Sequence, residues 1–487
     1  MSPRNALSSE WKSLITIALP VVAVQVGIML MGVVDTMMVG HVSAEALASV
    51  ALGNIYVFNV IILSMGALMA LDPLVSQSLG ARDDAGVTRA IQRGLVLSVF
   101  LSAATMLLMT PAAPLLRLFR QPVEVVPGAE VYVHINIIGV LPFLVFVVLR
   151  QSLQAIGRMA PIVITIVAAN VFNALANWVL IFGHLGFPAM GVAGSAIATV
   201  LGRWFMVVML LVVAWRELHP HVATFDRGAL ARGPLFRMLA LGLPIGLQQF
   251  LEVSSFAAVG LLMGTFGAVQ VASHQIALNL AALTFMVPLG VSAAAAVRVG
   301  HAVGANDPAR ARRAAKLSYA LGAGFMCTTA ALFLIAPRPL AEVFTEDAAL
   351  IAIAASLIPI AGFFQVFDGM QAVGAGVLRG LGDTRVPLVA MLSGYWLIGV
   401  PTGLLLAYRT GMGPRGLWWG FVAGLAAVAV FLLWRVRALF RRGVSRIVLD
   451  ELPPGGVQRT TQEPSTVGAS CPGSVTDERC GFDNGAT

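Results

Sequence analysis

The chain alternates long apolar runs with short polar segments, and most of the apolar runs have the length of a membrane-spanning helix. We count twelve runs that reach the roughly 20 residues a helix needs to cross a bilayer. They lie near residues 13–38, 46–71, 92–116, 128–149, 160–182, 189–214, 236–263, 269–296, 316–337, 348–376, 386–408 and 415–437. The pattern therefore predicts an all-α polytopic membrane protein with twelve transmembrane helices.

Composition agrees with this pattern and narrows the chemistry. Of the 487 residues, 58% are apolar and only 11% are charged, which excludes an ordinary soluble globule. The three cysteines are Cys327 in a span and Cys471 and Cys480 near the C-terminus, and they form neither a disulfide framework nor a spaced metal set. The spans contain no HExxH and no paired Asp-rich motif, so we expect no enzyme and no cofactor.

The basic residues indicate how the chain is oriented. If both termini face the cytoplasm, the inside segments hold 23 Lys and Arg and the outside loops hold 5. Because cytoplasmic loops carry the excess of Lys and Arg, we predict a multi-pass protein of the inner membrane with both termini in the cytoplasm. The formal charge of +8 then reflects topology and anionic lipid headgroups rather than a nucleic-acid partner.

The two halves of the chain resemble each other at an offset of 224 residues, which becomes 225 to 226 where AIGRMAP at 155–161 resembles GLGDTRVP at 380–387. The offset of 224 aligns Pro, Gln, Gly and Asp positions, which apolar helices do not share by chance; the pairs are Pro20 with Pro244, Gln25 with Gln249, Gly40 with Gly264, Gly66 with Gly290, Gly80 with Gly304, and Asp83 with Asp307. We therefore predict two pseudosymmetric six-helix bundles related by an axis along the membrane normal. The expected divisions are an N-terminal lobe (1–214), a cytoplasmic linker (215–235), a C-terminal lobe (236–446) and a disordered polar tail (447–487).

Acidic residues are rare inside the predicted spans. Of 23 Asp and Glu residues, only Asp35, Glu252 and Asp368 lie clearly within them. A charged side chain at the bilayer centre costs about 2.5–3.5 kcal/mol on insertion scales, so such a residue should face a wet cavity or a partner. We interpret the three acids as candidate cation-binding groups, with an ion pair or hydrogen bond that fixes helix packing as the alternative.

Helical spacing groups other polar residues with these acids. Gln249 lies one turn before Glu252, and Gln365 and Gln371 lie one turn to either side of Asp368, so each set shares one helix face. Burial disfavours a carboxylate anion, so such a group can exchange a proton for a cation. Carboxylate and amide oxygens also suit Na⁺ as hard ligands, which makes Glu252 and Asp368 a possible Na⁺ site. The sequence leaves the choice between Na⁺ and H⁺ open.

Two segments resemble signatures of the multidrug and toxic compound extrusion (MATE) family, in its NorM-like branch. These are VDTMMVGHVSAEALASVALGN at 34–54 and VLRGLGDTRVP at 377–387. The resemblance implies a secondary active multidrug efflux antiporter that exports cationic, often aromatic drugs by alternating access, in exchange for Na⁺ or H⁺, and so confers antibiotic resistance. It assigns cation or substrate binding to Asp35, Glu252 and Asp368. It further implicates Asn173 and Asn177 as the polar partners of Asp35.

The expected partners are therefore small cationic drugs, the coupling ion and membrane lipid, with the chain acting as a monomer. An alternative function is a flippase for a lipid-linked precursor, which shares the plan of two six-helix halves. A pyrophosphate headgroup would require several cationic residues between the halves, and Arg203 is the only central one. The sequence leaves Arg203 either as a structural partner or as a gating residue.

Overall fold

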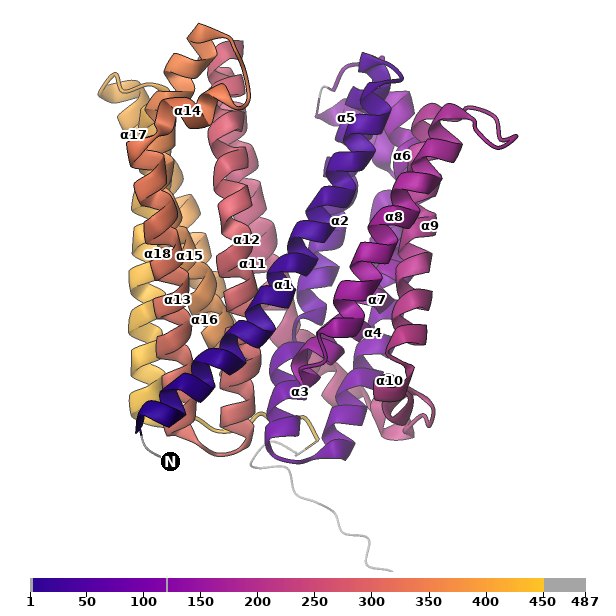
Figure 1. Cartoon of the computed structure of the whole chain (residues 1–487), viewed down its shortest axis with the longest axis vertical. Coiled ribbons are helices and arrows are strands. Elements are labelled where there is room, and N and C mark those ends of the chain that lie inside the picture. Colours follow the sequence, from indigo (N-terminus) through magenta and orange to yellow (C-terminus); the bar gives the residue numbers. More distant parts are fainter. Residues whose placement is uncertain (1–2, 120, 451–487) are drawn as a thin grey trace, which may run out of the picture. The chain divides into compact units, whose positions relative to one another are not determined.

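The computed structural model describes residues 3–119 and 121–450, and every regular element in these ranges is a helix (Figure 1). Within the described residues, eleven helices are long and apolar enough to span a membrane, and a bent helix pair raises this number to twelve if the pair is one span. This confirms the predicted all-α polytopic fold.

The first half of the chain forms the N-lobe. Its helices are α1 (Pro3–Gly40), α2 (Ala44–Leu68), α3 (Leu71–Gly80), α4 (Asp84–Met109), α5 (Ala112–Leu118), α6 (Val126–Ile137), α7 (Val140–Ile156), α8 (Ala160–Phe182) and α9 (Gly191–Val213). The linker follows as α10 (Trp215–Val222) and the 3₁₀ turn η1 (Arg227–Leu230). It is held against α4 because Gln92 Nε2 donates hydrogen bonds to the carbonyl oxygens of His221 (2.9 Å) and Thr224 (2.7 Å).

The second half forms the C-lobe. Its helices are α11 (Arg232–Gly264), α12 (Ala268–Gly304), α13 (Pro308–Ile335), α14 (Pro337–Glu342), α15 (Ala348–Gly380), α16 (Arg385–Met391), the π-helix η2 (Leu392–Gly399), α17 (Val400–Arg409) and α18 (Pro414–Arg442). The first of these begins at Arg232, slightly before the start of the lobe expected at residue 236.

The duplication extends to helix ends and their caps. α1 ends at Gly40 and α11 ends at Gly264, which are positions that the sequence repeat aligns. Asp83 accepts a hydrogen bond from the amide of Gly86 at the start of α4, and its counterpart Asp307 accepts one at the start of α13. Such caps satisfy amides that have no partner within the helix. The sequence repeat is therefore a structural repeat.

The two lobes differ in which of their membrane helices are interrupted, bent or partly π-helical. In the N-lobe, α2 and α3 are separated at Met69–Ala70, and α6 and α7 are bent by 55° around Ile138–Gly139. Their C-lobe counterparts, α12 and α15, are continuous. The C-lobe instead carries the π-helix η2 inside the span expected at 386–408, where the N-lobe has the regular helix α8. Such π segments are frequent at functional sites.

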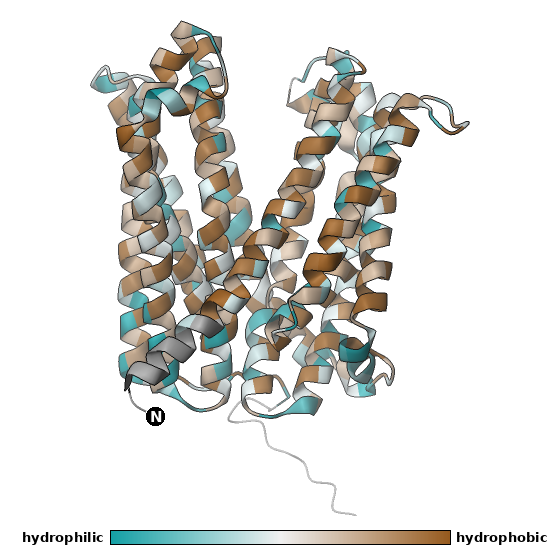
Figure 2. Cartoon of the chain, in the orientation of Figure 1, coloured by the Kyte–Doolittle hydropathy of each residue, from teal (hydrophilic) through white to brown (hydrophobic). Residues whose placement is uncertain are grey.

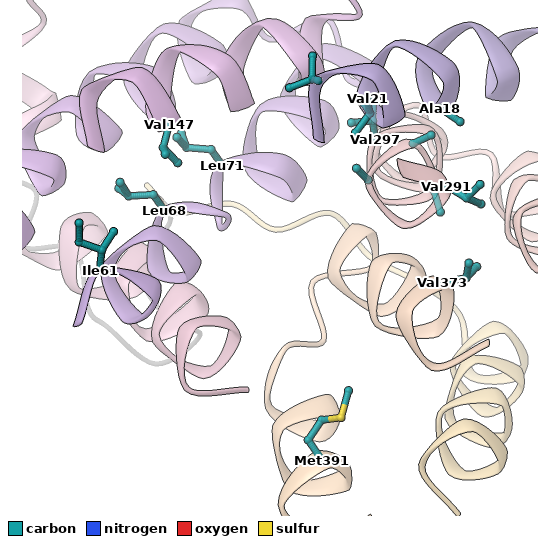
Figure 3. Close-up of a cluster of buried hydrophobic side chains, with 14 of the residues drawn as sticks. Ala18, Val21, Ile61, Leu68, Leu71, Val147, Val291, Val297, Val373 and Met391 are labelled. Atoms are coloured by element: carbon teal, nitrogen blue, oxygen red, sulfur yellow. The ribbon is translucent and has the colours of Figure 1, made fainter. Parts of the chain in front are cut away.

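Apolar packing holds the helices together in both lobes. Figure 2 shows hydrophobic residues along the middle of the helices and hydrophilic residues gathered at helix ends and turns. Ala18 and Val21 of α1 lie beside Val291 and Val297 of α12 within the buried cluster (Figure 3). Helix α1 therefore packs on the C-lobe as well as on its own lobe.

The lobes meet through a contact that is repeated about the pseudo-twofold axis. Gly80 of α3 packs on the His301 backbone of α12, and Gly304 packs on the Gln77 backbone in the same way. Gln77 Nε2 donates to the carbonyl of Gly380 (2.9 Å), and its counterpart His301 Nε2 donates to the carbonyl of Ala155 (2.8 Å). Each lobe therefore supplies the same two contacts to the other.

This junction lies at the end of the lobes that contains α3, which we call the α3 end. Nearby, Gly242 and Gly246 of α11 pack on the backbone of Ala67 and Leu63 in α2, so the helix axes approach closely. Figure 1 shows the lobes meeting at the α3 end and separating toward α5 and α14. The described lobes are thus closed at one end.

The segment after α18 crosses this junction, and we call residues 443–449 the strap. Arg446 donates to Asp83 Oδ2 (2.5 Å) and to Ser78 Oγ (3.3 Å) in the N-lobe, and the amide of Ile447 donates to Gln77 Oε1 (2.8 Å). At its end, the Leu449 carbonyl accepts a hydrogen bond from Arg237 of α11. The chain is therefore packed as far as Leu449, past the start of the tail expected at residue 447, and 451–487 lie outside the described residues.

We expect Arg446→Gln to lower the free energy of unfolding by about 1 kcal/mol, because a charge-assisted hydrogen bond and a partly exposed ion pair are lost. Arg446 holds the pKa of Asp83 below its ordinary value by hydrogen bonding to the anion. The stabilisation is therefore present above about pH 4 and is lost as the pH falls through the lowered pKa. Thermal unfolding in detergent at pH 7 and at pH 3 measures this. Arg442→Gln is the control because Arg442 is exposed on α18, and a difference from wild type that is as large at pH 3 as at pH 7 would contradict the assignment.

Candidate cation- and substrate-binding sites

Two acids from different helices of the C-lobe lie together. Glu252 is on α11 and is half-buried, and Asp368 is on α15 and is 5% exposed. Their carboxylates are close enough for the charge of Glu252 to act on Asp368, although the two residues are far apart in the chain. Two like charges in a buried setting are not both retained without compensation. The C-lobe pair is therefore suited to hold a proton or a cation.

The side chain of Tyr395 lies close enough to the pair for the charges of both acids to act on it. Tyr395 is only 1% exposed and lies in the π-helix η2. Sequence reasoning missed this residue. The segment LSGYWLIG gave no sign of a π-helix, because its composition is that of any apolar span.

Several buried polar atoms of the C-lobe have no hydrogen-bond partner among the described residues. They include Asp368 Oδ1, Gln371 Oε1 and Tyr395 Oη. Gln365 is partly satisfied because its Oε1 accepts a hydrogen bond from Thr284 (2.8 Å). Unsatisfied buried oxygens are costly, and they are suitable ligands for a hard cation.

A metal site made of ionisable residues alone does not occur in the described ranges. No group of three or more His, Cys, Asp and Glu side chains there could hold a metal ion. A Na⁺ carried at Glu252 and Asp368 would therefore need neutral oxygens, such as the Tyr395 hydroxyl, to complete its coordination. The orphaned oxygens of Asp368 and Tyr395 fit that requirement.

Aromatic rings pack around the acid pair in the C-lobe. Phe256 of α11 packs on Phe421 of α18, with ring centroids 5.0 Å apart, and lies 6.0 Å from the Tyr395 ring. Phe364 of α15 packs on Trp418 at 5.6 Å. These contacts fix the positions of α11, α15, η2 and α18 relative to one another. The elements that carry the pair and Tyr395 are thus joined to one another by contacts between aromatic rings.

The N-lobe acid has a different environment. Asp35 of α1 is 8% exposed, and Asn177 of α8 donates a hydrogen bond of 2.5 Å to its Oδ1. Asn173 is one turn away on α8, and its Oδ1 accepts from the same amide (3.2 Å). Thr199 of α9 lies 3.4 Å from Asp35 Oδ2. The structure therefore brings Asp35, Asn173 and Asn177 together and adds Thr199, which sequence reasoning missed.

Arg203 of α9 completes the N-lobe site. Its charge acts on Asp35, and its guanidinium lies over the Phe143 ring at 5.2 Å. The side chain also packs against Gly139, in the bend between α6 and α7. The N-lobe acid is thus compensated by donors and a cation, whereas the C-lobe acid has a second acid beside it.

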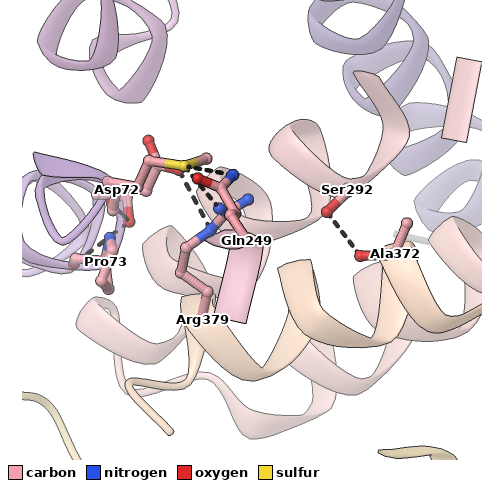
Figure 4. A network of polar contacts seen from close by, with 8 residues as sticks. Asp72, Pro73, Gln249, Ser292, Ala372 and Arg379 are labelled. Carbon is pink, nitrogen blue, oxygen red and sulfur yellow. Dashed lines mark hydrogen bonds and ion pairs between the residues drawn. The ribbon is translucent and has the colours of Figure 1, made fainter. Parts of the chain in front are cut away.

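The structure places Gln249 at the lobe junction. Its Nε2 donates to the sulfur of Met69 in the break between α2 and α3 (3.4 Å), and Arg379 of α15 contacts the same sulfur (3.6 Å) (Figure 4). Gln249 remains one turn from Glu252 on α11. Its amide therefore bridges the two lobes on the α3 side of the acid pair.

Comparison with known proteins identifies the family. The family model MatE matches twice, at residues 20–179 and 244–405, and each match covers one lobe's acid site. Multidrug resistance protein NorM of Burkholderia vietnamiensis is 37% identical over 429 residues, which are 86% of this chain and 92% of that protein. The chain belongs to the MATE family.

Further relatives of this MATE protein agree with its fold and branch. Multidrug resistance protein PmpM of Pseudomonas aeruginosa is 36% identical over 443 residues, covering 90% of this chain and 93% of that protein. The crystal structure of the eukaryotic MATE transporter AtDTX14 matches with a TM-score of 0.82 at 24% identity, over 90% of this chain and 98% of that one. The chain is thus a NorM-like MATE transporter with the two-lobe helical fold of the family.

Proposed function

We propose that this MATE protein is a secondary active multidrug efflux antiporter that exports cationic, often aromatic drugs in exchange for inward Na⁺ or H⁺. The observation that carries the proposal is the interacting pair of carboxylates within a membrane lobe, the half-buried Glu252 and the buried Asp368. The pair attracts a monovalent cation of any kind, so drug and coupling ion compete for it. The family membership and the relatives named for multidrug resistance support the same function.

The two acid sites are proposed to have different roles. Asp35 is already compensated by Asn177 and Arg203, so it responds to small changes in its hydrogen-bond partners. The C-lobe pair has no comparable basic partner in the interactions described for it, so it depends on a bound cation or proton. Gln249 is proposed to sense the state of Glu252 from the neighbouring turn and pass it to the junction at Met69.

The proposed setting is the bacterial inner membrane with both termini in the cytoplasm and a monomeric chain. The α3 end is then the cytoplasmic end, and the described structure is closed toward the cytoplasm. The alternative function of a lipid-precursor flippase has no observation in its favour, because Arg203 is engaged with Asp35 and Phe143.

Transport into inverted proteoliposomes tests the proposal. Purified protein is reconstituted, ethidium is supplied outside, and an imposed Na⁺ gradient and an imposed pH gradient are applied in separate experiments. At least one gradient should drive ethidium uptake against its concentration, and its effect should collapse when an ionophore dissipates that gradient. Uptake that neither gradient drives would refute the antiport mechanism.

A further inference from the structure

The lobe junction contains a buried ion pair that breaks its twofold symmetry. Arg379 Nε of α15 lies 3.3 Å from Asp72 Oδ2 of α3, and Asp72 is 0% exposed (Figure 4). The positions related to this pair by the repeat are Ala296 and Gln154, which carry no charge. The contacts that the repeat duplicates, between Gly80 and His301 and between Gly304 and Gln77, involve no ion pair. The duplicated packing of the lobes therefore does not depend on the pair of Arg379 and Asp72.

Arg379 leaves the Asp72 carboxylate incompletely satisfied. Neither oxygen of Asp72 accepts a hydrogen bond from the described residues, and Arg379 Nε donates none. A second basic residue, Arg150 of α7, acts on Asp72 through its charge without forming a direct ion pair. Arg150 is held by a hydrogen bond of 3.2 Å to Gln25 Oε1 of α1. Asp72 is therefore in direct contact with Arg379 of the C-lobe and within range of the charge of Arg150 in its own lobe.

Alternating access requires the lobes to separate at this end, and the separation removes Arg379 from Asp72. Removing one partner from a buried ion pair is strongly unfavourable because it leaves an uncompensated charge. Arg150 belongs to the N-lobe, in which α7 packs on α3, so it stays near Asp72 when the lobes part. Its free Nε and the free Asp72 oxygens are available for a new contact.

We propose that Arg150 is a positioning residue of the transport cycle that takes over Asp72 from Arg379 when the cytoplasmic junction opens. The proposal rests on the alternating-access function proposed above. Arg379 stabilises the closed junction, and Arg150 stabilises the open one. The two arginines thus act on one carboxylate with opposite effects on the conformational equilibrium.

Spin-label distances measure that equilibrium without any transport assay. Nitroxide labels are placed at Ala85→Cys and Ala309→Cys, which are exposed and occupy equivalent first turns of α4 and α13 in the two lobes. The native cysteines are replaced by serine. A Gly304→Ala background provides a measurable open population, because the added methyl group meets the Gln77 backbone and strains the closed junction.

In this background, Arg379→Gln should raise the ratio of open to closed junction at least about tenfold, and Arg150→Gln should lower it at least about tenfold. Arg150→Lys should retain most of the open population. In an Asp72→Asn background, Arg150→Gln should have no effect, because the charge that it serves is gone. Arg158→Gln, an exposed arginine that follows α7, is the matched control for loss of charge.

Two results would overturn the proposal. One is a shift in the same direction for Arg150→Gln and Arg379→Gln, and the other is an Arg150→Gln effect that persists with Asp72→Asn. A single distance population in every variant would also overturn it, since the lobes would then not separate at this end. The elution volume and the helical circular dichroism signal of each labelled variant should match those of wild type, which shows that the variants are folded. Because the distances are measured without drug or ion gradient, this test stays separate from that of antiport.

Discussion

Replacing Glu252 by Gln, or Asp368 by Asn, is expected to abolish ion-coupled drug transport while leaving expression close to normal. Each substitution keeps the shape of the side chain and removes one of the two charges of the C-lobe pair. At about 4 Å and an effective dielectric constant near 20, one unit charge attracts a monovalent cation by roughly 4 kcal/mol. Loss of that attraction corresponds to about a thousandfold weaker binding, which exceeds what a transport cycle can tolerate.

The same variants test whether the coupling ion and the drug share the site. In the wild type, drug affinity should fall as Na⁺ rises or as the pH falls, because either change neutralises the pair. By linkage, drug binding must release ion or proton with the same free energy. Titration of ethidium affinity against Na⁺ and pH in detergent should show this dependence, and Glu252→Gln should remove most of it.

Two further variants complete that experiment, one at an exposed control position and one at the N-lobe acid. Glu346→Gln removes an exposed acid of the same lobe and should behave as wild type. Asp35→Asn should also reduce transport strongly, because its carboxylate organises Asn177 and Thr199. Wild-type transport rates in Asp35→Asn, Glu252→Gln and Asp368→Asn would assign these buried charges to helix packing alone.

Gly304→Ala is expected to shift the protein strongly toward a state that is open at the α3 end. The Cβ atom would collide with the carbonyl of Gln77, a backbone group that cannot rotate away. Overpacking of this kind costs about 1–3 kcal/mol, which corresponds to roughly a 5- to 150-fold change in the equilibrium between the two conformations. The turnover rate of transport should fall as the population of the closed conformation falls, because each transport cycle has to pass through that conformation.

Reactivity of a cysteine at the junction measures this shift. Ser76→Cys lies against Gly300 in the closed contact, so a water-soluble maleimide should modify it faster when Gly304→Ala is also present. Gly324→Ala on α13 is the matched control, because a methyl group there meets only open space. Equal labelling rates with and without Gly304→Ala would show that the junction tolerates the methyl group.

The fold could be predicted from the sequence because its signals are local or strictly repeated. Span length, the offset between the halves and the aligned pair Asp83 and Asp307 can all be read from short segments. The interruptions were not predicted. The bend at Gly139 and the π-helix η2 occur in segments whose composition also suits a straight helix, so packing against other helices decides between the alternatives.

For the candidate site, the sequence predicted which polar residues share one face of a helix, but not how the helices come together. Spacing placed Asp368 on a polar face and Glu252 on another, but it gave no information about which faces meet. Tyr395 and Thr199 were missed because they reach the acids from helices distant in sequence. Asp72 and Arg379 belong to opposite halves of the chain, and no local pattern links them.

The repeated contact at the α3 end also bears on how such a chain arises. Gly80 with His301 and Gly304 with Gln77 form an isologous interface, in which residue i meets j while j meets i. Two identical six-helix subunits with parallel orientation in the membrane would pair by this same contact. Gene fusion of such a homodimer preserves the interface and allows each copy to diverge. The two halves of the present chain differ in this way, since the first has the interrupted helices and Arg203 and the second has the acid pair and the π-helix.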